Sequence, residues 1–280
     1  MEGSRAQSFD INNENLRRIQ RGEAPAGTGE VRMDYFGHSC IRVVSPQGLS
    51  VLIDPWRNDA AWGWWFPIDF PEITVDIALS THAHFDHDAL HIPKARITME
   101  RLVGTFSLGD VRITGLADKH MNTAVGKTRW TEIQKDTGEN FLPPTNNLHM
   151  DNCILVLETG GVTIVHWGDN RPEPDGWVRD YLKNIPIDVL LLPVDESEHI
   201  LSYAQADTIM REYSPALTVP VHYLTHGVNT VLSTLQPAEP WVRTHAGAMN
   251  IAAASLTLKK DQYPREGKTV ATYGSNYTLE

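Results

Sequence analysis

Apolar residues along this chain gather in short runs that are separated by glycine, proline and polar residues. Short runs rich in β-branched residues and bounded by turn residues predict strands. The first three runs are joined by Gly37–Ser39 and Pro46–Gly48, which predicts an antiparallel meander, and Thr159–Gly161 predicts a hairpin turn. The predicted strands are Val31–Phe36, Ile41–Val44, Leu49–Ile53, Val75–Thr81, Arg96–Met99, Val111–Leu116, Cys153–Glu158, Val162–His166, Ile187–Val194 and Leu217–Val221.

The second half of the chain alternates these strands with helical patterns. Helices are predicted over Trp177–Asn184 and Tyr203–Tyr213, the second with Ser202 as its N-cap. This order favours an α/β (α+β) fold in which two mixed β-sheets pack face to face with helices outside.

The N-terminal region differs in composition from the rest. A short polar helix is predicted over Asn12–Arg21, followed by a Gly/Pro/Ala linker. We therefore expect an arm over residues 1–29 and a single domain over 30–280. Within that domain, Met121–Leu148 is a long and mostly polar segment, typical of a functional lid or of disorder.

Composition narrows the classes of partner. The chain has 280 residues, of which 41% are hydrophobic and 21% charged, and its net charge of −11 argues against a nucleic-acid partner. Cys40 and Cys153 are the only cysteines, too few for a disulfide framework. Neither a membrane-spanning apolar stretch nor a signal-peptide pattern is visible, so we expect a cytoplasmic protein without a transmembrane segment.

The densest chemistry lies in His82–His87, where three imidazoles and a carboxylate fall within the sequence HAHFDH. This segment follows a predicted strand, a usual place for a site held on a rigid scaffold. Imidazole and carboxylate together suit zinc, iron and related cations. A solvated His-rich loop is the alternative, but ligands close in sequence need little loop closure, which favours a metal site with two neighbouring ions.

Three more potential ligands stand directly after predicted strands. They are His120, Asp169 and His222, each preceded by an apolar run. Four strand ends that converge on one edge of a sheet would form a metal cup.

These motifs resemble those of the metallo-β-lactamase superfamily of zinc-dependent hydrolases, over roughly Val31 to Tyr223. The opening segments also look like the lactonase and phospholipase-D-like branch. The resemblance implies an αββα four-layer sandwich. The matching segments are Gly37–Val43, Val51–Pro55, His82–His87, His120 or His149, Gly168–Asp169 and Pro220–Tyr223.

The same resemblance implies a set of metal ligands for one or two Zn²⁺ ions per chain. Two histidines of the first motif and a third histidine would bind one ion, Asp86, His87 and His222 would bind the other, and Asp169 would bridge. His120 is favoured as the third histidine, and His149, which precedes the next strand, competes. The ligands are His82, His84, Asp86, His87, His120, Asp169 and His222.

The expected chemistry is hydrolysis of a small molecule. Zinc lowers the pKa of a bound water to about 7 and so supplies hydroxide at neutral pH. Its target would be the electrophilic carbon or phosphorus of a lactone, phosphodiester or activated aryl halide. Asp86, His84 or His149 would transfer the proton.

Three alternatives stay open. Asn170 follows the bridging position and could ligate in a one-zinc site similar to that of hydrolytic chlorothalonil dehalogenases, with His84 handling protons. A similar cup can hold two irons in a redox protein, which iron content and absorbance would reveal. A structural zinc site is disfavoured, because such sites are four-coordinate and often Cys-rich.

A tryptophan-rich loop is the clue to the substrate. Trp62, Trp64 and Trp65, near Trp56, fit neither a helix nor a strand period. They could form a mouth for a hydrophobic or aromatic substrate, with Asn170 as a polar contact. The loop could equally be tucked into the core or form a homodimer contact.

The remaining polar residues have simpler expected roles. His38 is expected to be a structural contact and His166 a satisfied core residue. Asp54 is expected to support a ligating imidazole, since such ligands donate their other N–H to a carboxylate or carbonyl. Arg57 and Arg171 could bind an anionic substrate group.

Overall fold

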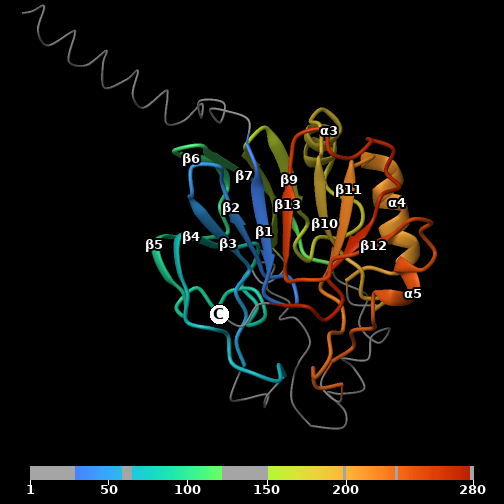
Figure 1. The fold of residues 1–280 in the computed structure, drawn as a ribbon, viewed down its shortest axis with the longest axis horizontal. Helices are drawn as coiled ribbons and strands as arrows, with labels where there is room; N and C mark the ends of the chain where they lie inside the picture. Colours follow the sequence, from blue (N-terminus) through green and yellow to red (C-terminus); the bar gives the residue numbers. More distant parts are fainter. Residues whose placement is uncertain (1–28, 59–64, 122–150, 198–199, 231–232, 278–280) are drawn as a thin grey trace, which may run out of the picture.

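The structure is a computed structural model that describes residues 29–58, 65–121, 151–197, 200–230 and 233–277. Two six-stranded sheets pack face to face (Figure 1). The predicted arm, the helix over Asn12–Arg21 and nearly all of Met121–Leu148 lie outside the described residues, so these expectations stay predictions.

The first sheet combines an antiparallel and a parallel half. Its strands are β1 (Val31–Tyr35), β2 (Ile41–Val44), β3 (Ser50–Ile53), β4 (Thr74–Ser80), β5 (Lys94–Glu100) and β13 (Ser255–Leu258). They lie in the order β13-β1-β2-β3-β4-β5. Strands β1 to β3 form the predicted antiparallel meander, whereas β3, β4 and β5 run parallel.

The second sheet is also mixed. Its strands are β6 (Gly104–Leu108), β7 (Val111–Lys119), β8 (Asp151–Thr159), β9 (Val162–His166), β10 (Val189–Pro193) and β11 (Leu217–Val221). They lie in the order β11-β10-β9-β8-β7-β6. Gly160 and Gly161 both have positive φ, 58° and 77°, which is the backbone that a two-residue hairpin turn requires, so the predicted turn is confirmed.

Helices accompany the second sheet in the described residues. They are α3 (Gly176–Lys183), α4 (Tyr203–Tyr213) and α5 (Glu239–Val242). Because β9, β10 and β11 are parallel, α3 and α4 form the crossovers between them. The Ser202 side chain accepts from the Gln205 backbone N–H in a capping box, as its N-cap position predicts. Figure 1 shows α4 outside β11, and β12 (Met249–Asn250) pairs with β14 (Ala271–Thr272) beside it.

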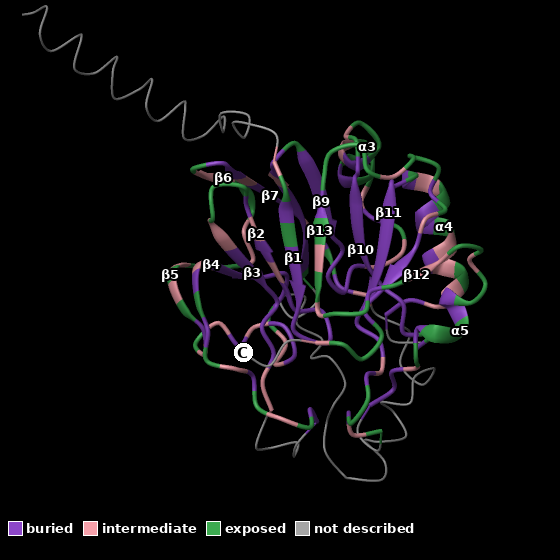
Figure 2. Cartoon of the chain, viewed as in Figure 1, coloured by how far each residue is buried: buried purple, intermediate pink, exposed green. Residues whose placement is uncertain are grey.

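The main core lies between the sheets, where the buried residues of Figure 2 concentrate. In β3, Val51 and Ile53 face this core, while Leu52 points to the other face and joins a second cluster. Trp56 and Phe66 belong to that second cluster. An aromatic loop therefore covers the outer face of the first sheet in the described residues, where a helix layer was expected.

The predicted fold class is confirmed: two mixed sheets packed as a sandwich with helices outside. Strands β6, β12, β13 and β14 and helix α5 were not predicted. Cys40 and Cys153 are buried and free, as expected. Within the described residues, every helix is too short or too polar to cross a lipid bilayer.

Candidate metal centre

Four loops bring the predicted ligands together from both sheets. His82–His87 follows β4 of the first sheet, while His120 follows β7, Asp169 follows β9 and His222 follows β11 in the second. The predicted convergence of strand ends is therefore present in the structure.

Three histidines form one half of the site, which we call the first position: His82, His84 and His120. Their ring nitrogens lie within 4.8 Å of one another. His82 Nε2 and His84 Nδ1 are 3.0 Å apart, and the His120 ring stands edge-on to both at 4.8 Å between centroids. The structure thus brings His120 to the place that the resemblance gave to a third histidine.

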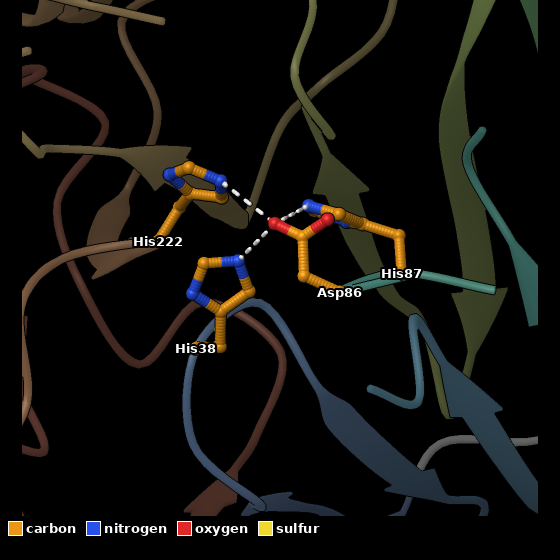
Figure 3. A group of neighbouring side chains, drawn as sticks. All are labelled: His38, Asp86, His87 and His222. Atoms are coloured by element: carbon orange, nitrogen blue, oxygen red, sulfur yellow. Dashed lines mark hydrogen bonds and ion pairs between the residues drawn. The ribbon is translucent and has the colours of Figure 1, made fainter. Parts of the chain in front are cut away.

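Asp86, His87 and His222 form the other half, the second position, with His38 beside them. Figure 3 shows the three imidazoles turned toward one oxygen of Asp86. Their Nε2 atoms lie 3.0 Å (His38), 3.6 Å (His87) and 3.8 Å (His222) from Asp86 Oδ2.

Asp169 lies between the two positions. Its Oδ2 is 3.3 Å from Nε2 of both His120 and His222 and 3.7 Å from Nε2 of His82, while its Oδ1 is 3.4 Å from His87 Nε2. Two ligand atoms on a tetrahedral zinc are about 3.4 Å apart, given zinc–nitrogen bonds of about 2.1 Å. The distances from the Asp169 carboxylate to these imidazoles therefore match the spacing of ligands that bind the same ion.

Several of these atoms lack a hydrogen bond. His87 Nε2, His222 Nε2 and Asp169 Oδ1 are buried and make none to the described residues. Buried polar atoms are nearly always hydrogen-bonded, and each exception calls for a reason. Imidazole nitrogens and carboxylate oxygens that point at one another can share a bound cation through their lone pairs. The residues present therefore fit a metal ion.

The first position is anchored from outside by neutral groups. His82 Nδ1 is 3.0 Å from the Thr81 hydroxyl, and His120 Nδ1 donates to the Met121 carbonyl at 2.6 Å. Burial, with neighbouring imidazoles, lowers the pKa of His82 well below its usual value and that of His84 to about 4. These two rings are neutral at pH 7 and ready to ligate.

The second position is anchored by carboxylates. His87 Nδ1 donates to Asp54 Oδ2 at 2.8 Å, as expected of Asp54, and His222 Nδ1 lies 3.4 Å from Asp195 Oδ2. Burial alone would lower the pKa of His87, but Asp169 and the other nearby carboxylates raise it to about 10. The pKa of His222 is likewise raised, by Asp169 above all, against the effect of burial.

Backbone strain gathers at this site. His38, Asp54 and His222 each have a φ of 55°, in the left-handed region that non-glycine residues rarely adopt. Such conformations persist where the surrounding structure imposes them, often at functional sites.

A glycine turn places the bridging carboxylate. Gly168 has a φ of 57°, and a Cβ there would lie 2.5 Å from Asn152 Oδ1 and 2.8 Å from Thr81 Cβ. The same Asn152 oxygen accepts from the Asp169 backbone N–H at 3.1 Å. Glycine is thus needed for the close packing that holds Asp169.

Asn170 points its amide into a hydrogen-bond network. Its oxygen accepts from Asn152 at 3.1 Å, and its nitrogen donates to Asp118 at 3.0 Å. Asp118 in turn accepts from Arg171, which also pairs with Asp175. The roles predicted for Asn170, as a ligand or a substrate contact, stay predictions, and its amide is engaged elsewhere in this structure.

Aromatic side chains lie next to the metal centre. His84 and Phe85 are half-buried, whereas the other proposed ligands are buried. Trp65 lies 4.9 Å from Phe85 between ring centroids and is itself buried in the second cluster. Trp65 therefore belongs to the core and at the same time stands beside the site.

Some predicted residues fall outside this picture. Trp62, Trp64 and His149 lie outside the described residues. Arg57 pairs with Asp88, so this arginine and Arg171 are both engaged with carboxylates.

His38 makes a structural contact, as expected, and the contact is with a predicted ligand, since its ring is within hydrogen-bonding distance of Asp86. Its only sequence signal was a position in a turn after a strand. His166 is a satisfied core residue, as expected: Nε2 donates to the Ser39 carbonyl and Nδ1 accepts from the Gly168 N–H.

A family model, the Beta-lactamase superfamily domain, matches residues 32–222, more than half of the chain. This chain belongs to the beta-lactamase superfamily. The matched region contains all seven predicted ligands, and the expected family is confirmed. The lactonase and phospholipase-D-like branch stays a prediction.

Relatives within the superfamily agree with the expected hydrolase class. A metal-dependent hydrolase from Thermodesulfovibrio yellowstonii is 24% identical, and the match covers 71% of this chain and 81% of the relative. One from Rubrobacter xylanophilus is 28% identical, covering 70% and 83%. A cytidine monophosphate-N-acetylneuraminic acid hydroxylase from Asterias rubens is 31% identical, but the match covers 49% of this chain and 23% of the hydroxylase.

Solved structures share the fold. A protein from Thermotoga maritima, described as a Zn-dependent hydrolase of the metallo-β-lactamase superfamily, aligns with a TM-score of 0.58 at 20% identity, covering 86% of this chain and 98% of that one. A diiron β-hydroxylase from Streptomyces venezuelae aligns with a TM-score of 0.51 at 15% identity, covering 84% and 55%. At these identities the likeness concerns the fold alone.

Proposed function

We propose that this chain is a zinc-dependent hydrolase of small molecules, with a two-metal centre. The favoured substrate is a neutral electrophile, such as a lactone or an activated aryl halide, and a phosphodiester, which is anionic at pH 7, is the alternative. The family and its metal-dependent hydrolases support the reaction class.

The observation that carries the proposal is the convergence of Nε2 atoms on Asp169. Four histidines from three strand ends approach this one carboxylate at 3.3 to 3.7 Å. Each of these rings has a polar group beside its outer Nδ1 nitrogen. Anchored outer nitrogens and converging inner nitrogens are what metal-ligating histidines show.

The residues divide the work between binding and proton transfer. The first ion would be held by His82, His84 and His120 and the second by Asp86, His87 and His222, and Asp169 lies close enough to serve both positions. A zinc ion bound by these residues would supply the chemistry of an activated water at neutral pH.

His84 is the half-buried member of the set, so it faces the incoming substrate and is placed to transfer a proton. Asp86 is the second candidate, because the imidazoles around it keep its pKa well below the usual value although burial would raise it. Phe85 and Trp65 contribute an apolar wall that excludes water from the reacting centre.

Charge supports a neutral substrate. Arg57 and Arg171 are paired with carboxylates, and the net charge of the chain is −11. An anionic group would find neither of these cations free. An apolar or aromatic group would find Phe85 and Trp65.

Iron is the competing metal, since His and Asp also suit non-haem iron. The hydrolase relatives match over more than four-fifths of their length, the hydroxylase over less than a quarter, which favours hydrolysis. A one-zinc dehalogenase site would recruit Asn170, whose amide is bonded to Asn152 and Asp118. We therefore favour two ions over one.

The test is elemental analysis followed by a panel of lactones, phosphodiesters and activated aryl halides. Wild type is compared with His87→Ala and with His91→Ala, an exposed histidine as matched control. The proposal is supported if the wild-type protein contains zinc and its turnover is lost in His87→Ala, lost with a chelator and restored by Zn²⁺. Turnover that persists in His87→Ala and after chelation contradicts the proposal, as does iron content with visible absorbance.

A further inference from the structure

The geometry points to His38 as a positioning residue that fixes the second metal position by holding two of its ligands at once. This inference rests on the metal centre of the proposed function. His38 is not one of the proposed ligands, and it comes from the turn between β1 and β2, which carries no other part of the centre.

The side chain of His38 holds Asp86. Its Nε2 is 3.0 Å from Asp86 Oδ2, in a buried contact that spans 48 positions of sequence. An ionised carboxylate only accepts hydrogen bonds, so Nε2 carries the proton and donates. The oxygen it fixes is the one that faces His87 and His222, as Figure 3 shows.

The backbone of His38 holds His222. The His222 N–H donates to the His38 carbonyl at 2.9 Å, and the two rings are 4.1 Å apart between centroids. Asp86 comes from the loop after β4 and His222 from the end of β11, so they share no local structure. His38 therefore joins two ligands from different sheets.

The turn itself is closed by backbone hydrogen bonds. Phe36 and Cys40 are linked by a hydrogen bond from the Phe36 N–H to the Cys40 carbonyl, and the Cys40 N–H donates to the Gly37 carbonyl. His38 sits at its tip with a φ of 55°. A strained, buried residue in a closed turn is held in one orientation, which suits a group that must aim a hydrogen bond.

Aromatic packing holds the ring from the other side. The His38 ring meets Phe66 edge-on at 5.6 Å and lies 6.0 Å from Trp65. The Trp56 indole N–H donates to the Phe36 carbonyl and ties the same loop to the turn. The aromatic loop thus supports the second position through His38 without contributing a ligand.

His38 differs from the ligating histidines in its anchoring. The four rings whose Nε2 atoms face Asp169 have a polar group beside Nδ1. In the described residues, the one hydrogen bond made by the His38 ring is the bond to Asp86. This pattern fits a hydrogen-bond donor to a ligand and not a further ligand.

The experiment measures stepwise binding of Zn²⁺ and Co²⁺ to the metal-free full-length chain, by competition with a chromophoric chelator and by visible absorbance of the Co²⁺ form. Asp86→Ala identifies the step that belongs to the second position. His38→Phe keeps an aromatic ring and removes the donor, and His38→Gln keeps an N–H near the position of Nε2. His91→Ala is the control.

Asp86→Ala should abolish one binding step. His38→Phe should lower the metal affinity of that same step by about 10- to 100-fold, which is the usual effect of removing the hydrogen-bond partner of a ligand, and should change the affinity of the other step by less than about threefold. His38→Gln should recover part of the loss. Unchanged steps, equal weakening of both steps, or no recovery in His38→Gln would overturn the role of His38. If the wild-type chain binds no metal, the proposed function is overturned together with the role of His38. If the wild type binds metal but the His38 variants behave otherwise than expected, only the role of His38 is overturned.

Discussion

The two halves of the metal centre contain similar donors but differ in what stands behind them. The first position is supported by the Thr81 hydroxyl and the Met121 carbonyl, which are neutral. The second is supported by the carboxylates of Asp54 and Asp195. A carboxylate behind an imidazole raises its basicity and its affinity for a metal, so we expect the second position to bind a metal more strongly than the first.

Protonation follows the same division. The pKa values of His82 and His84 are lowered, mainly by burial, whereas those of His87 and His222 are raised by the surrounding carboxylates. We therefore expect protons at the second position in the absence of metal, where they would balance its negative charge. Each proton must leave before a metal binds.

The largest expected effect is therefore one of pH. Metal binding at the second position should release about two protons at pH 7, from His87 and His222, so its affinity should rise about 100-fold per pH unit. The rise should end as the pH passes the His87 pKa of about 10. Affinity at the first position should be nearly flat over pH 7 to 9. Calorimetric titration in buffers of different ionisation enthalpy counts the protons.

The stability of the metal-free protein should fall as the pH rises, whereas the metal affinity should increase. Folded-state pKa values above the unfolded value of about 6.5 mean that His87 and His222 stabilise the fold below that pH. This contribution should be lost as the pH rises through about 10. Metal-free protein whose unfolding midpoint in urea is the same at pH 7 and pH 10 would contradict the protonated second position.

Asp169→Asn tests what the two halves share. Because Asp169 faces imidazoles of both positions, the variant should lose metal from both and lose hydrolysis by about 10³-fold, the upper range for removal of one electrostatic contact in a reacting centre. Its backbone N–H can still bond Asn152, so the fold should persist. Metal content by mass spectrometry and far-UV circular dichroism check this. Loss from one position alone would show that Asp169 does not bridge.

Asp54→Asn and Thr81→Val compare the two kinds of support directly. Asp54→Asn removes the charge behind His87, and asparagine tolerates the φ of 55° at this position. It should weaken the second position by about 10- to 100-fold. Thr81→Val should weaken the first position by less, about threefold, because a neutral hydroxyl polarises His82 less.

The outcome is read from stepwise Co²⁺ titrations of both variants. Thr81 also donates to Asp54, so Thr81→Ser, which keeps the hydroxyl, is the matched control. Equal losses in Asp54→Asn and Thr81→Val would remove the asymmetry on which the comparison rests.

Much of the framework could be predicted from local sequence. The apolar runs of β2, β9 and β11 have the predicted bounds, because short β-branched runs between turn residues favour strands in many contexts. The capping box fixed the start of α4. Ligands after strand ends could be proposed because each followed an apolar run along the chain.

Other features depended on contacts between distant segments. Strand β13 has one buried residue and forms by pairing with β1 more than 200 residues away. His38 holds an oxygen 48 positions along the chain, and Trp65 packs in a cluster that covers an outer sheet face. A local pattern carries no signal for such contacts, which is why the roles of His38 and Trp65 emerged only from the fold.

The smallest expected effect concerns a charge pair outside both positions. Arg171 donates to Asp118, whose carboxylate also accepts from Asn170 next to Asp169. Arg171→Met should lower the free energy of unfolding by about 1–3 kcal/mol, because it leaves a buried carboxylate with one partner fewer. It should leave KM for neutral substrates within about twofold, since these do not need the guanidinium. Urea unfolding and initial-rate kinetics measure the two effects. A large rise in KM with unchanged stability would mean that Arg171 leaves Asp118 to bind substrate, and the preferred substrate would then be anionic.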